Sequence, residues 1–334
     1  MEPRTRRRVV TILRVLDDAG KPVGSTRIAR ELHAQGIDLS QRTIRYYLGL
    51  MDQEGLTRSL GKRGREITAR GEDELHGAMT VEKVGFMAAT VDALAYRMTF
   101  DLERLTGDVI LNISLVDTAD VRQAAEEMVE VFAAGLGMGK YVAVARSGER
   151  LGGYAVPSGK CAFGTICSIT VNGVLLKAGI VEHSRFGSLL EMREGRPHRF
   201  TQIINYTGTT IDPLEIFIRG KMTEVRRAAR TGNGIVGASF REIPTAAINE
   251  VERINAELER RGLGAALIIG RPNQAVLDVP VMEGRTGIIV MAGLNPLAAV
   301  EESGIETTNW AMKTMFPLDR LVPIDRLQAM VAGS

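Results

Sequence analysis

Cysteine, histidine and tryptophan are scarce in this sequence of 334 residues, which contains two, four and one of them. Cys161 and Cys167 provide no disulfide framework, which is compatible with a reducing cytosol. Together with His183 they match no common zinc spacing, and two thiols packed beside a strand fit the pattern better. The sequence therefore predicts neither a disulfide nor a metal site.

Long apolar runs and catalytic motifs are missing as well. The first residues lack the apolar core of a signal peptide, and no apolar run is long enough to span a bilayer. The sequence contains no G-x-S-x-G and no H-E-x-x-H. The glycine-rich stretch 135–140 follows a predicted helix and opens a strand, the reverse of a nucleotide loop, so we interpret it as a helix stop. We expect a cytoplasmic protein with no membrane partner, no cofactor and no catalytic residues.

Charge is distributed unevenly along the chain. The formal net charge is only +2, but residues 1–70 hold 15 Lys/Arg and 8 Asp/Glu. This first segment therefore carries +7 and the remainder carries −5. A basic head on a slightly acidic body predicts an anionic partner for the head alone.

Residues 40–55 have the pattern of a helix that enters the major groove of DNA. Ser40 is a good N-cap and Gly55 a good stop. Apolar residues at three- and four-residue spacing form one inner stripe: Ile44, Tyr47, Leu48 and Met51. Off that stripe lie side chains that can hydrogen-bond bases and phosphates, so we predict DNA contacts from Ser40, Gln41, Arg42, Thr43, Arg45 and Tyr46.

A short hairpin is predicted directly after this helix. Strands are expected at 56–60 and 66–68, joined by a glycine-punctuated tip that carries three cations: Lys62, Arg63 and Arg65. Such a tip suits a neighbouring phosphate or the minor groove. The alternative is a solvated amphipathic helix beside an ordinary hairpin.

Two further helices precede this unit, at Arg4–Ala19 and Thr26–Ala34, the second capped by Ser25. Three helices and a wing indicate a winged helix-turn-helix domain at residues 1–76. Further phosphate contacts are possible from Arg6, Arg7, Arg8, Arg27 and Arg30, although arginine-rich termini are often only solvated surface. The polar stretch 70–80 is expected to be the domain boundary.

The rest of the chain matches itself when it is shifted by 125 residues. Glycines recur in the same order, as in Gly107/Gly232 and Gly137/Gly262, and Ser114/Ser239 also coincide. This predicts a multidomain chain whose α/β body consists of two repeated halves, at 82–203 and 204–325. Each half is expected to contain strand, helix, strand, strand and helix in mixed sheets. The predicted strands and helices are 109–116, 119–134, 141–145 and 165–171 in the first half and 235–240, 246–261, 265–269 and 287–291 in the second.

Both halves place an asparagine where a buried strand is expected to end and a helix to begin. Asn172 and Asn295 hold these positions, and a helix N-terminus at the end of a strand is a ready anion site. Lys160, Arg185 and Arg285 could add fixed cations. The alternative is that the asparagines only cap helices and the arginines face water. The hydroxyl-rich stretch 205–213 either lines a cleft between the halves or forms a turn-rich connector.

The body segments TICSITVNGVLLKAGI, SRFGSLLEM, NYTGTTIDPLEIFI and VMAGLNPLAAVEESGI, placed after a winged helix, resemble the NrpR-type nitrogen-assimilation repressors of archaea. The resemblance covers essentially the whole chain. It implies a repressor that binds palindromic double-stranded operators as a homodimer, with a tetramer as the alternative, and that is released by the small-molecule effector 2-oxoglutarate. Some members carry two regulatory domains, whereas this chain has one.

Two other classes of function stay open from the sequence. The body could be an enzyme whose synthesis the head controls, or a scaffold that binds another regulator without a small ligand. Turnover of keto acids or amino acids would identify the first class, and calorimetry with 2-oxoglutarate separates the second from a sensor.

Overall fold

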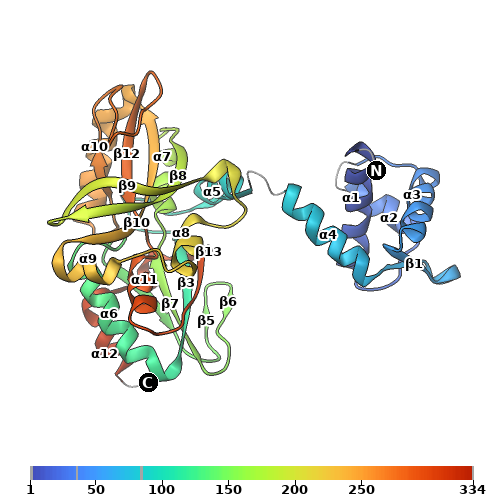
Figure 1. Cartoon of the computed structure of the whole chain (residues 1–334), viewed down its shortest axis with the longest axis horizontal. Helices are drawn as coiled ribbons and strands as arrows, with labels where there is room; N and C mark the ends of the chain where they lie inside the picture. Colours follow the sequence, from blue (N-terminus) through green and yellow to red (C-terminus); the bar gives the residue numbers. More distant parts are fainter. Residues whose placement is uncertain (1–2, 35–36, 83–85, 333–334) are drawn as a thin grey trace. The chain divides into compact units, whose positions relative to one another are not determined.

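The structure, a computed structural model, describes the backbone of residues 3–34, 37–82 and 86–332, with side chains except at 3–7, 34, 76–82 and 86. It divides into two compact units, which we call the head, Met1–Val84, and the body, Gly85–Ser334. Figure 1 labels most of the helices and many of the strands of both units. Within the described ranges, no helix combines the length and apolar character that crossing a membrane requires.

The head contains the predicted three helices and wing. The helices are α1 (Pro3–Ala19), α2 (Ser25–Ala34) and α3 (Gln41–Gln53), and the wing strands are β1 (Thr57–Ser59) and β2 (Arg65–Ile67). A short 3-10 turn, η1 (Gly61–Arg63), forms the wing tip. The predicted stripe of α3 is buried against the other helices, as expected for a small domain core.

Local interactions at both ends of α3 agree with the sequence. The Ser40 hydroxyl accepts a hydrogen bond from the Thr43 N–H at 3.1 Å, which satisfies one orphan donor of the first turn. At the other end Gly55 adopts φ +70°, and the Leu56 N–H donates to the Met51 carbonyl at 2.8 Å. The glycine therefore allows the chain to reverse into β1 without steric strain.

The prediction of a polar boundary at 70–80 is wrong, because this stretch belongs to helix α4 (Ala69–Glu82). The Thr68 hydroxyl accepts from the Gly71 N–H at 3.1 Å, and Leu75 is buried in the head core. A Cβ at Gly71 would lie only 2.1 Å from the Leu56 carbonyl oxygen, so glycine here permits close packing. The glycine and polar residues of this stretch form a capped helix of the head and do not mark the domain boundary.

The body contains two five-stranded sheets. The first, in order, consists of β13 (Thr308–Pro317), β3 (Asp108–Asp117), β7 (Lys160–Ile166), β4 (Tyr141–Ala145) and β14 (Val322–Pro323). The second consists of β11 (Ala266–Ile269), β12 (Arg285–Met291), β10 (Gly234–Pro244), β8 (His183–Arg193) and β9 (Arg196–Asn205).

Every pair of neighbouring strands in these two sheets is antiparallel, so the prediction of mixed sheets is wrong. The reason is that β7 lies between β3 and β4, and β12 between β10 and β11. The two strands joined by a helix crossover, β3 and β4 or β10 and β11, are therefore not neighbours in the sheet. An antiparallel strand, β7 or β12, lies between them. This is the β-α-β-β-α-β arrangement of ferredoxin-like folds.

Helices and short turns complete the body. The longer helices are α5 (Phe86–Arg97), α6 (Val121–Ala133), α7 (Ile169–Lys177), α10 (Ile248–Arg260) and α11 (Asn295–Glu302). The shorter ones are α8 (Pro213–Arg219), α9 (Val225–Thr231) and α12 (Leu327–Val331), with a small hairpin of β5 (Arg150–Leu151) and β6 (Tyr154–Ala155). The 3-10 turns are η2 (Thr118–Asp120), η3 (Tyr206–Gly208), η4 (Thr245–Ala247), η5 (Leu318–Arg320) and η6 (Ile324–Arg326).

The two segments predicted as halves exchange strands in the structure. The order β4-β7-β3-β13 in one sheet corresponds to β11-β12-β10-β8 in the other. Strand β8 belongs to the first segment but pairs with β10 of the second, and β13 belongs to the second segment but pairs with β3 of the first. The segments 82–203 and 204–325 therefore interleave, because each sheet is completed by a strand from the other segment.

Equivalent hydrogen bonds occur in both sheets, at spacings that correct the predicted single shift. The Cys167 N–H donates to the Ile110 carbonyl at 2.8 Å, and the Ala292 N–H donates to the Gly237 carbonyl at 3.0 Å. The two donors, Cys167 and Ala292, are 125 residues apart, as predicted. The two acceptors, Ile110 of β3 and Gly237 of β10, are 127 residues apart. Helices α6 and α10 also begin 127 apart, at Val121 and Ile248. The identities proposed before β7, such as Ser114/Ser239, are therefore out of register by two residues.

The strand predicted at 165–171 is also wrong in its second half. Strand β7 ends at Ile166, and the N–H groups of Thr170 and Val171 donate to the carbonyls of Cys167 and Ser168 to begin α7. Residues 169–175 are buried on every side of this helix. A helix without a solvated face has no apolar period, so its sequence cannot be told from a buried strand.

Candidate functional site

The exposed face of α3 carries the predicted DNA contacts. Gln41, Arg42 and Arg45 are exposed, and the Tyr46 ring has 64% of its surface accessible. The Arg45 guanidinium donates to the Gln41 side-chain oxygen at 3.3 Å, whereas Arg42 has no hydrogen-bond or ion-pair partner among the described residues. Ser40 and Thr43 lie at the helix start, with their hydroxyl oxygens 2.9 Å apart. Exposed polar groups at the start of a helix can bond to base edges, and Arg42 has no internal bond to give up in the described part of the chain.

The wing presents two exposed cations and holds a third. Lys62 and Arg63 are exposed in η1. Arg65 instead donates to the Asp52 carboxylate at 2.8 Å, and the same carboxylate accepts from the Thr57 hydroxyl at 2.6 Å. Asp52 thus joins the end of α3 to both wing strands, and Arg65 fixes the wing in place.

The other arginines of the head differ in their surroundings. Arg8 donates to the Tyr47 hydroxyl at 2.9 Å, and Arg27 lies 3.7 Å from the Glu31 carboxylate. Arg30 is exposed. The side chains of Arg6 and Arg7 lie outside the described residues.

A small cavity of about 20 Å³ in the body lies where the turns β7–α7 and β12–α11 meet. The turns contact each other directly, since a Cβ at Gly293 would lie 2.1 Å from the Ile166 carbonyl oxygen. The cavity is lined by residues 167–169 of the first turn, 292–294 of the second, and polar groups of the neighbouring segments: Asn112, Tyr206 and Asp212. The N-termini of α7 and α11 therefore converge on one point, and each contributes positive potential there.

A buried arginine adds a full charge beside this cavity. Arg241 of β10 is fully buried, and its guanidinium donates to the Ser239 hydroxyl at 3.0 Å and to the Ser168 hydroxyl at 3.1 Å. Its Nε lies 3.9 Å from the Glu182 carboxylate and has no hydrogen-bond partner among the described residues. A buried cation with an unfilled donor attracts an anion, because burial has removed the water that would satisfy it.

Two carboxyl groups near the cavity have raised pKa values. Burial raises the pKa of Glu182 to about 7, although Arg241 and Ser184 partly oppose it. Burial also raises the pKa of Asp212 to about 7, against the lowering effect of the Leu214 N–H that the carboxylate accepts. Both groups therefore change charge near neutral pH.

Three of the five predicted effector residues converge on the segment 181–185. Asn172 donates to the Ser184 hydroxyl at 2.9 Å and to the Glu182 carboxylate. Arg185 bonds the buried Glu242 carboxylate at 2.7 Å, and Arg285 donates to the Val181 carbonyl at 3.3 Å. Asn172 is the fourth residue of α7, however, so the prediction that it ends a strand is wrong.

The other two predicted effector residues lie apart from this segment. Lys160 forms an ion pair with Asp117 at 2.8 Å, and the Asp117 carboxylate raises the pKa of this lysine. Asn295 is the first residue of α11 and not the end of a strand. Its side-chain oxygen accepts from the Gly237 N–H at 2.8 Å, and its amide donates to the carbonyls of Gly237 and Leu136, both at 2.9 Å. All these bonds join α11 to its surroundings within the fold.

Arg241 and Glu182 were missed by the sequence reasoning. A single arginine inside the apolar strand sequence GASFREIP is the signal that could have found Arg241. Tyr206 and Asp212 belong to the hydroxyl-rich stretch 205–213, and the structure puts both in the cavity wall.

The head and the body together define a winged-helix protein with an α/β regulatory body. The profile of the family described as "Ribonuclease R winged-helix domain" matches residues 10–75, within the head. The profile described as "NrpR regulatory domains NRD1 and 2" matches residues 84–322, which is most of the chain. The chain belongs to the NrpR family of regulators.

Curated relatives support this assignment. The chain is 34% identical to the global nitrogen regulator NrpRI of Methanosarcina mazei, over 94% of this chain and 97% of that protein. It is 31% identical to the global nitrogen regulator NrpR of Methanococcus maripaludis over 88% of this chain, but it spans only 51% of that relative. A crystal structure of a nitrogen repressor-like protein from Methanococcus jannaschii shares the fold, with a TM-score of 0.61, 24% identity, and coverage of 71% of this chain and 98% of that one. The curated relatives are named as regulators and not as enzymes.

Proposed function

We propose that the chain is a DNA-binding repressor of nitrogen-assimilation genes whose grip on its operator is released by 2-oxoglutarate. The single observation that carries the DNA-binding half is the exposed face of α3, where Arg42 has no internal partner among the described residues. Placed on a winged-helix head with exposed wing cations, this face has the chemistry for reading a major groove. The relatives named as global nitrogen regulators support the choice of target genes.

The effector site proposed here is the cavity between the N-termini of α7 and α11. A dianion needs sheltered cations or aimed N–H groups. Two helix N-termini offer N–H groups, and the buried Arg241, which donates to Ser168 in the cavity wall, offers a cation with an unfilled donor. Arg285, Arg185 and Asn172 extend this polar region toward the segment 181–185.

The size of the cavity supports a conformational response. Its volume of about 20 Å³ holds roughly one water molecule and not a five-carbon dianion. Binding therefore requires the turns β7–α7 and β12–α11 to separate, and they belong to different sheets. An effector that binds only the separated state shifts the population of the body by its differential affinity. In a homodimer, such a shift changes the spacing of the two heads, which have to meet half-sites about 34 Å apart or a multiple of it.

DNA binding is tested with fragments selected from a random duplex pool by the full chain. Fluorescence anisotropy at fixed salt compares the parent with Arg42→Ala and Arg45→Ala. Each variant should bind at least about fivefold more weakly, because a bidentate base contact contributes roughly 1–3 kcal/mol. Arg30→Ala, an exposed arginine of α2, is the matched control for charge alone. Equal losses for all three variants would indicate nonspecific attraction and contradict a reading role for α3.

Effector binding is tested by calorimetry of the full chain with 2-oxoglutarate. Saturable binding that Ser168→Ala weakens, together with loss of DNA binding at saturation, supports the proposed sensor. Binding of selected DNA without any heat from 2-oxoglutarate would leave a DNA-binding protein whose body acts as a scaffold. Turnover of 2-oxoglutarate would indicate an enzyme.

A further inference from the structure

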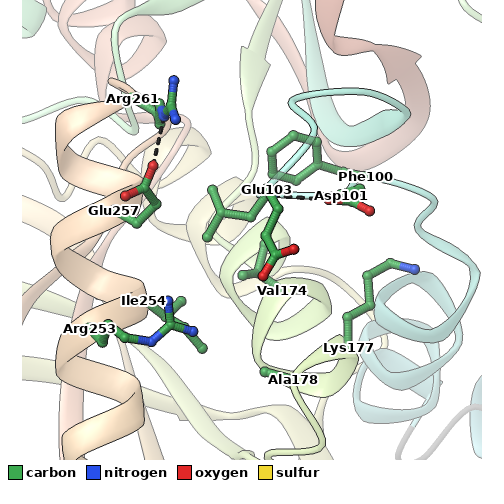
Figure 2. A pocket seen from close by; sticks show the side chains of 11 residues that line it. Phe100, Asp101, Glu103, Val174, Lys177, Ala178, Arg253, Ile254, Glu257 and Arg261 are labelled. Carbon is green, nitrogen blue, oxygen red and sulfur yellow. Dashed lines mark hydrogen bonds and ion pairs between the residues drawn. The ribbon is translucent and has the colours of Figure 1, made fainter.

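A second, larger pocket of about 460 Å³ lies elsewhere in the body, between α7 and α10 and below the loop 100–103 (Figure 2). This volume falls in the range of roughly 300–1,000 Å³ that small-molecule sites occupy. All three segments contribute apolar lining, which comes from Phe100, Leu102, Val174, Ala178 and Ile254. None of its lining residues belongs to the effector cavity.

The corresponding groove in the other half of the body is filled by the chain itself. There α9 lies on α6 and α11: Arg226 bonds the Glu127 carboxylate at 2.8 Å, and Arg230 bonds Glu127 at 3.2 Å and Glu130 at 2.7 Å. The Glu302 carboxylate of α11 accepts the N–H groups of Val225 and Arg226, each at 2.8 Å. An acidic groove thus receives a cationic helix.

The residues at the equivalent positions of the open pocket differ in character. Ile254 of α10 stands 127 residues after Glu127, the spacing that relates α10 to α6. Lys177 of α7 stands 125 residues before Glu302, the spacing that relates the ends of α7 and α11. The acid at the centre of the groove is replaced by an apolar side chain, and the acid at its edge by a cation. The open pocket is therefore unsuited to a second arginine-bearing helix.

Two opposite charges, on Lys177 and Glu103, line the open pocket. Lys177 and Glu103 line it from α7 and from the loop, and no hydrogen bond or ion pair joins either side-chain charge to another group in the described part of the chain. The Glu103 backbone N–H donates to the Asp101 carboxylate at 3.0 Å. The pKa of Arg253 is raised by Glu250 above all, and the Glu103 charge contributes to this shift. Figure 2 shows the Glu103 side chain pointing from the loop toward Val174 of α7. The other cations of the wall have acids of their own, since Arg253 bonds Glu250 at 2.6 Å and Arg261 bonds Glu257 at 2.7 Å.

We propose that this pocket binds a zwitterionic α-amino acid with an apolar side chain. The ligand carboxylate pairs with the Lys177 ammonium, and the ligand ammonium pairs with the Glu103 carboxylate. The side chain lies on the apolar lining formed by Val174 and Ile254. This amino-acid site uses no residue of the DNA-binding face or of the effector cavity. Failure of the amino-acid proposal would therefore leave the proposed function intact, and the reverse also holds.

Calorimetry of the full chain with L-leucine, L-methionine and L-valine tests the proposal. We expect saturable binding of one molecule per chain. Because each end of the ligand forms a charge-assisted hydrogen bond, 4-methylpentanoate, which lacks the ammonium, and 3-methylbutylamine, which lacks the carboxylate, should each bind at least about tenfold more weakly than L-leucine. Absence of saturable heat from all three amino acids up to about 10 mM overturns the proposal.

Variants assign the binding to this pocket. Lys177→Met and Glu103→Gln should each weaken L-leucine binding by about tenfold or more. Both residues are exposed, so the variants keep the fold, which the emission of Trp310 in the body can check. Lys140→Met and Glu126→Gln are the matched controls, since both residues are exposed and lie outside the pocket. Binding that neither test variant weakens would overturn the assignment.

Discussion

Replacement of Asn295 by alanine tests whether the Asn295 side chain stabilises the fold or serves to bind a ligand. Its side chain is buried and makes three hydrogen bonds, two with Gly237 of β10 and one with Leu136. In Asn295→Ala the Gly237 N–H and the Leu136 carbonyl lose this partner inside the protein. The Gly237 carbonyl keeps the Ala292 N–H at 3.0 Å.

The expected cost follows from these groups. A buried donor or acceptor left without a partner costs about 1–3 kcal/mol. Two such groups and a small cavity give a loss of about 3–5 kcal/mol in the free energy of unfolding of the body. Thr170→Val is the matched control, because Thr170 stands 125 residues earlier and bonds the Ile110 N–H and carbonyl at 3.3 and 3.4 Å. These longer bonds predict a cost of about 1 kcal/mol.

The assay is urea unfolding followed by the fluorescence of Trp310. This is the only tryptophan of the sequence, and it lies on β13 against the ring of Tyr154. Its emission therefore reports the body and not the head. A structural role for Asn295 is contradicted if Asn295→Ala lowers the free energy of unfolding by less than about 1 kcal/mol, or if Thr170→Val lowers it by as much as Asn295→Ala does. Either result would favour ligand binding as the role of Asn295.

Three other outcomes are expected. Asp52→Ala releases Arg65 and Thr57, so DNA affinity should fall several-fold in anisotropy while α3 stays folded; unchanged affinity would show that the wing is held by other contacts. Asp212→Asn keeps an N-cap oxygen but removes a carboxyl whose pKa is raised to about 7. The folded parent holds this proton up to about pH 7, whereas the unfolded chain loses it at lower pH, so the parent loses stability as pH rises from 5 to 8. In urea titrations, the free energy of unfolding of the variant should therefore rise relative to that of the parent by about 2–3 kcal/mol over that range. A pH-independent difference would contradict a buried titrating Asp212. Binding of a dianion near Glu182 should raise the pKa of that carboxyl further, so calorimetry near pH 7 in phosphate and Tris should detect proton uptake that Glu182→Gln removes.

The head was predictable because its structure depends on local interactions. The Ser40 cap, the Gly55 stop and the apolar stripe of α3 lie within a few residues of one another, and each is confirmed. The error at 70–80 arose where burial decided the structure: Leu75 makes α4 part of the head core, and no local pattern reports that contact.

In the body, the sequence predicted the first strand, the long helix and the next strands of each segment, but neither the last strands β8 and β13 nor the pairing. Self-similarity indicated the equivalent elements, and the two-residue change of spacing was hidden because shared glycines dominated the match. The exchange of β8 and β13 between sheets could not be predicted, because either sheet offers each strand a similar edge. A buried strand and a buried helix also have the same composition, which is why 165–171 was assigned wrongly.

The sequence by itself determined a winged-helix head, and it predicted both the side chains that contact DNA and a body of two related α/β segments. Only the tertiary structure decided that the N-termini of α7 and α11 meet beside Arg241, and that α9 fills one interhelical groove while the other stays open. The physical reason is the sequence separation over which each kind of interaction acts. Caps, turns and periodicity act over a few residues, whereas burial, ionisation and the convergence of charges depend on segments separated by a hundred residues or more.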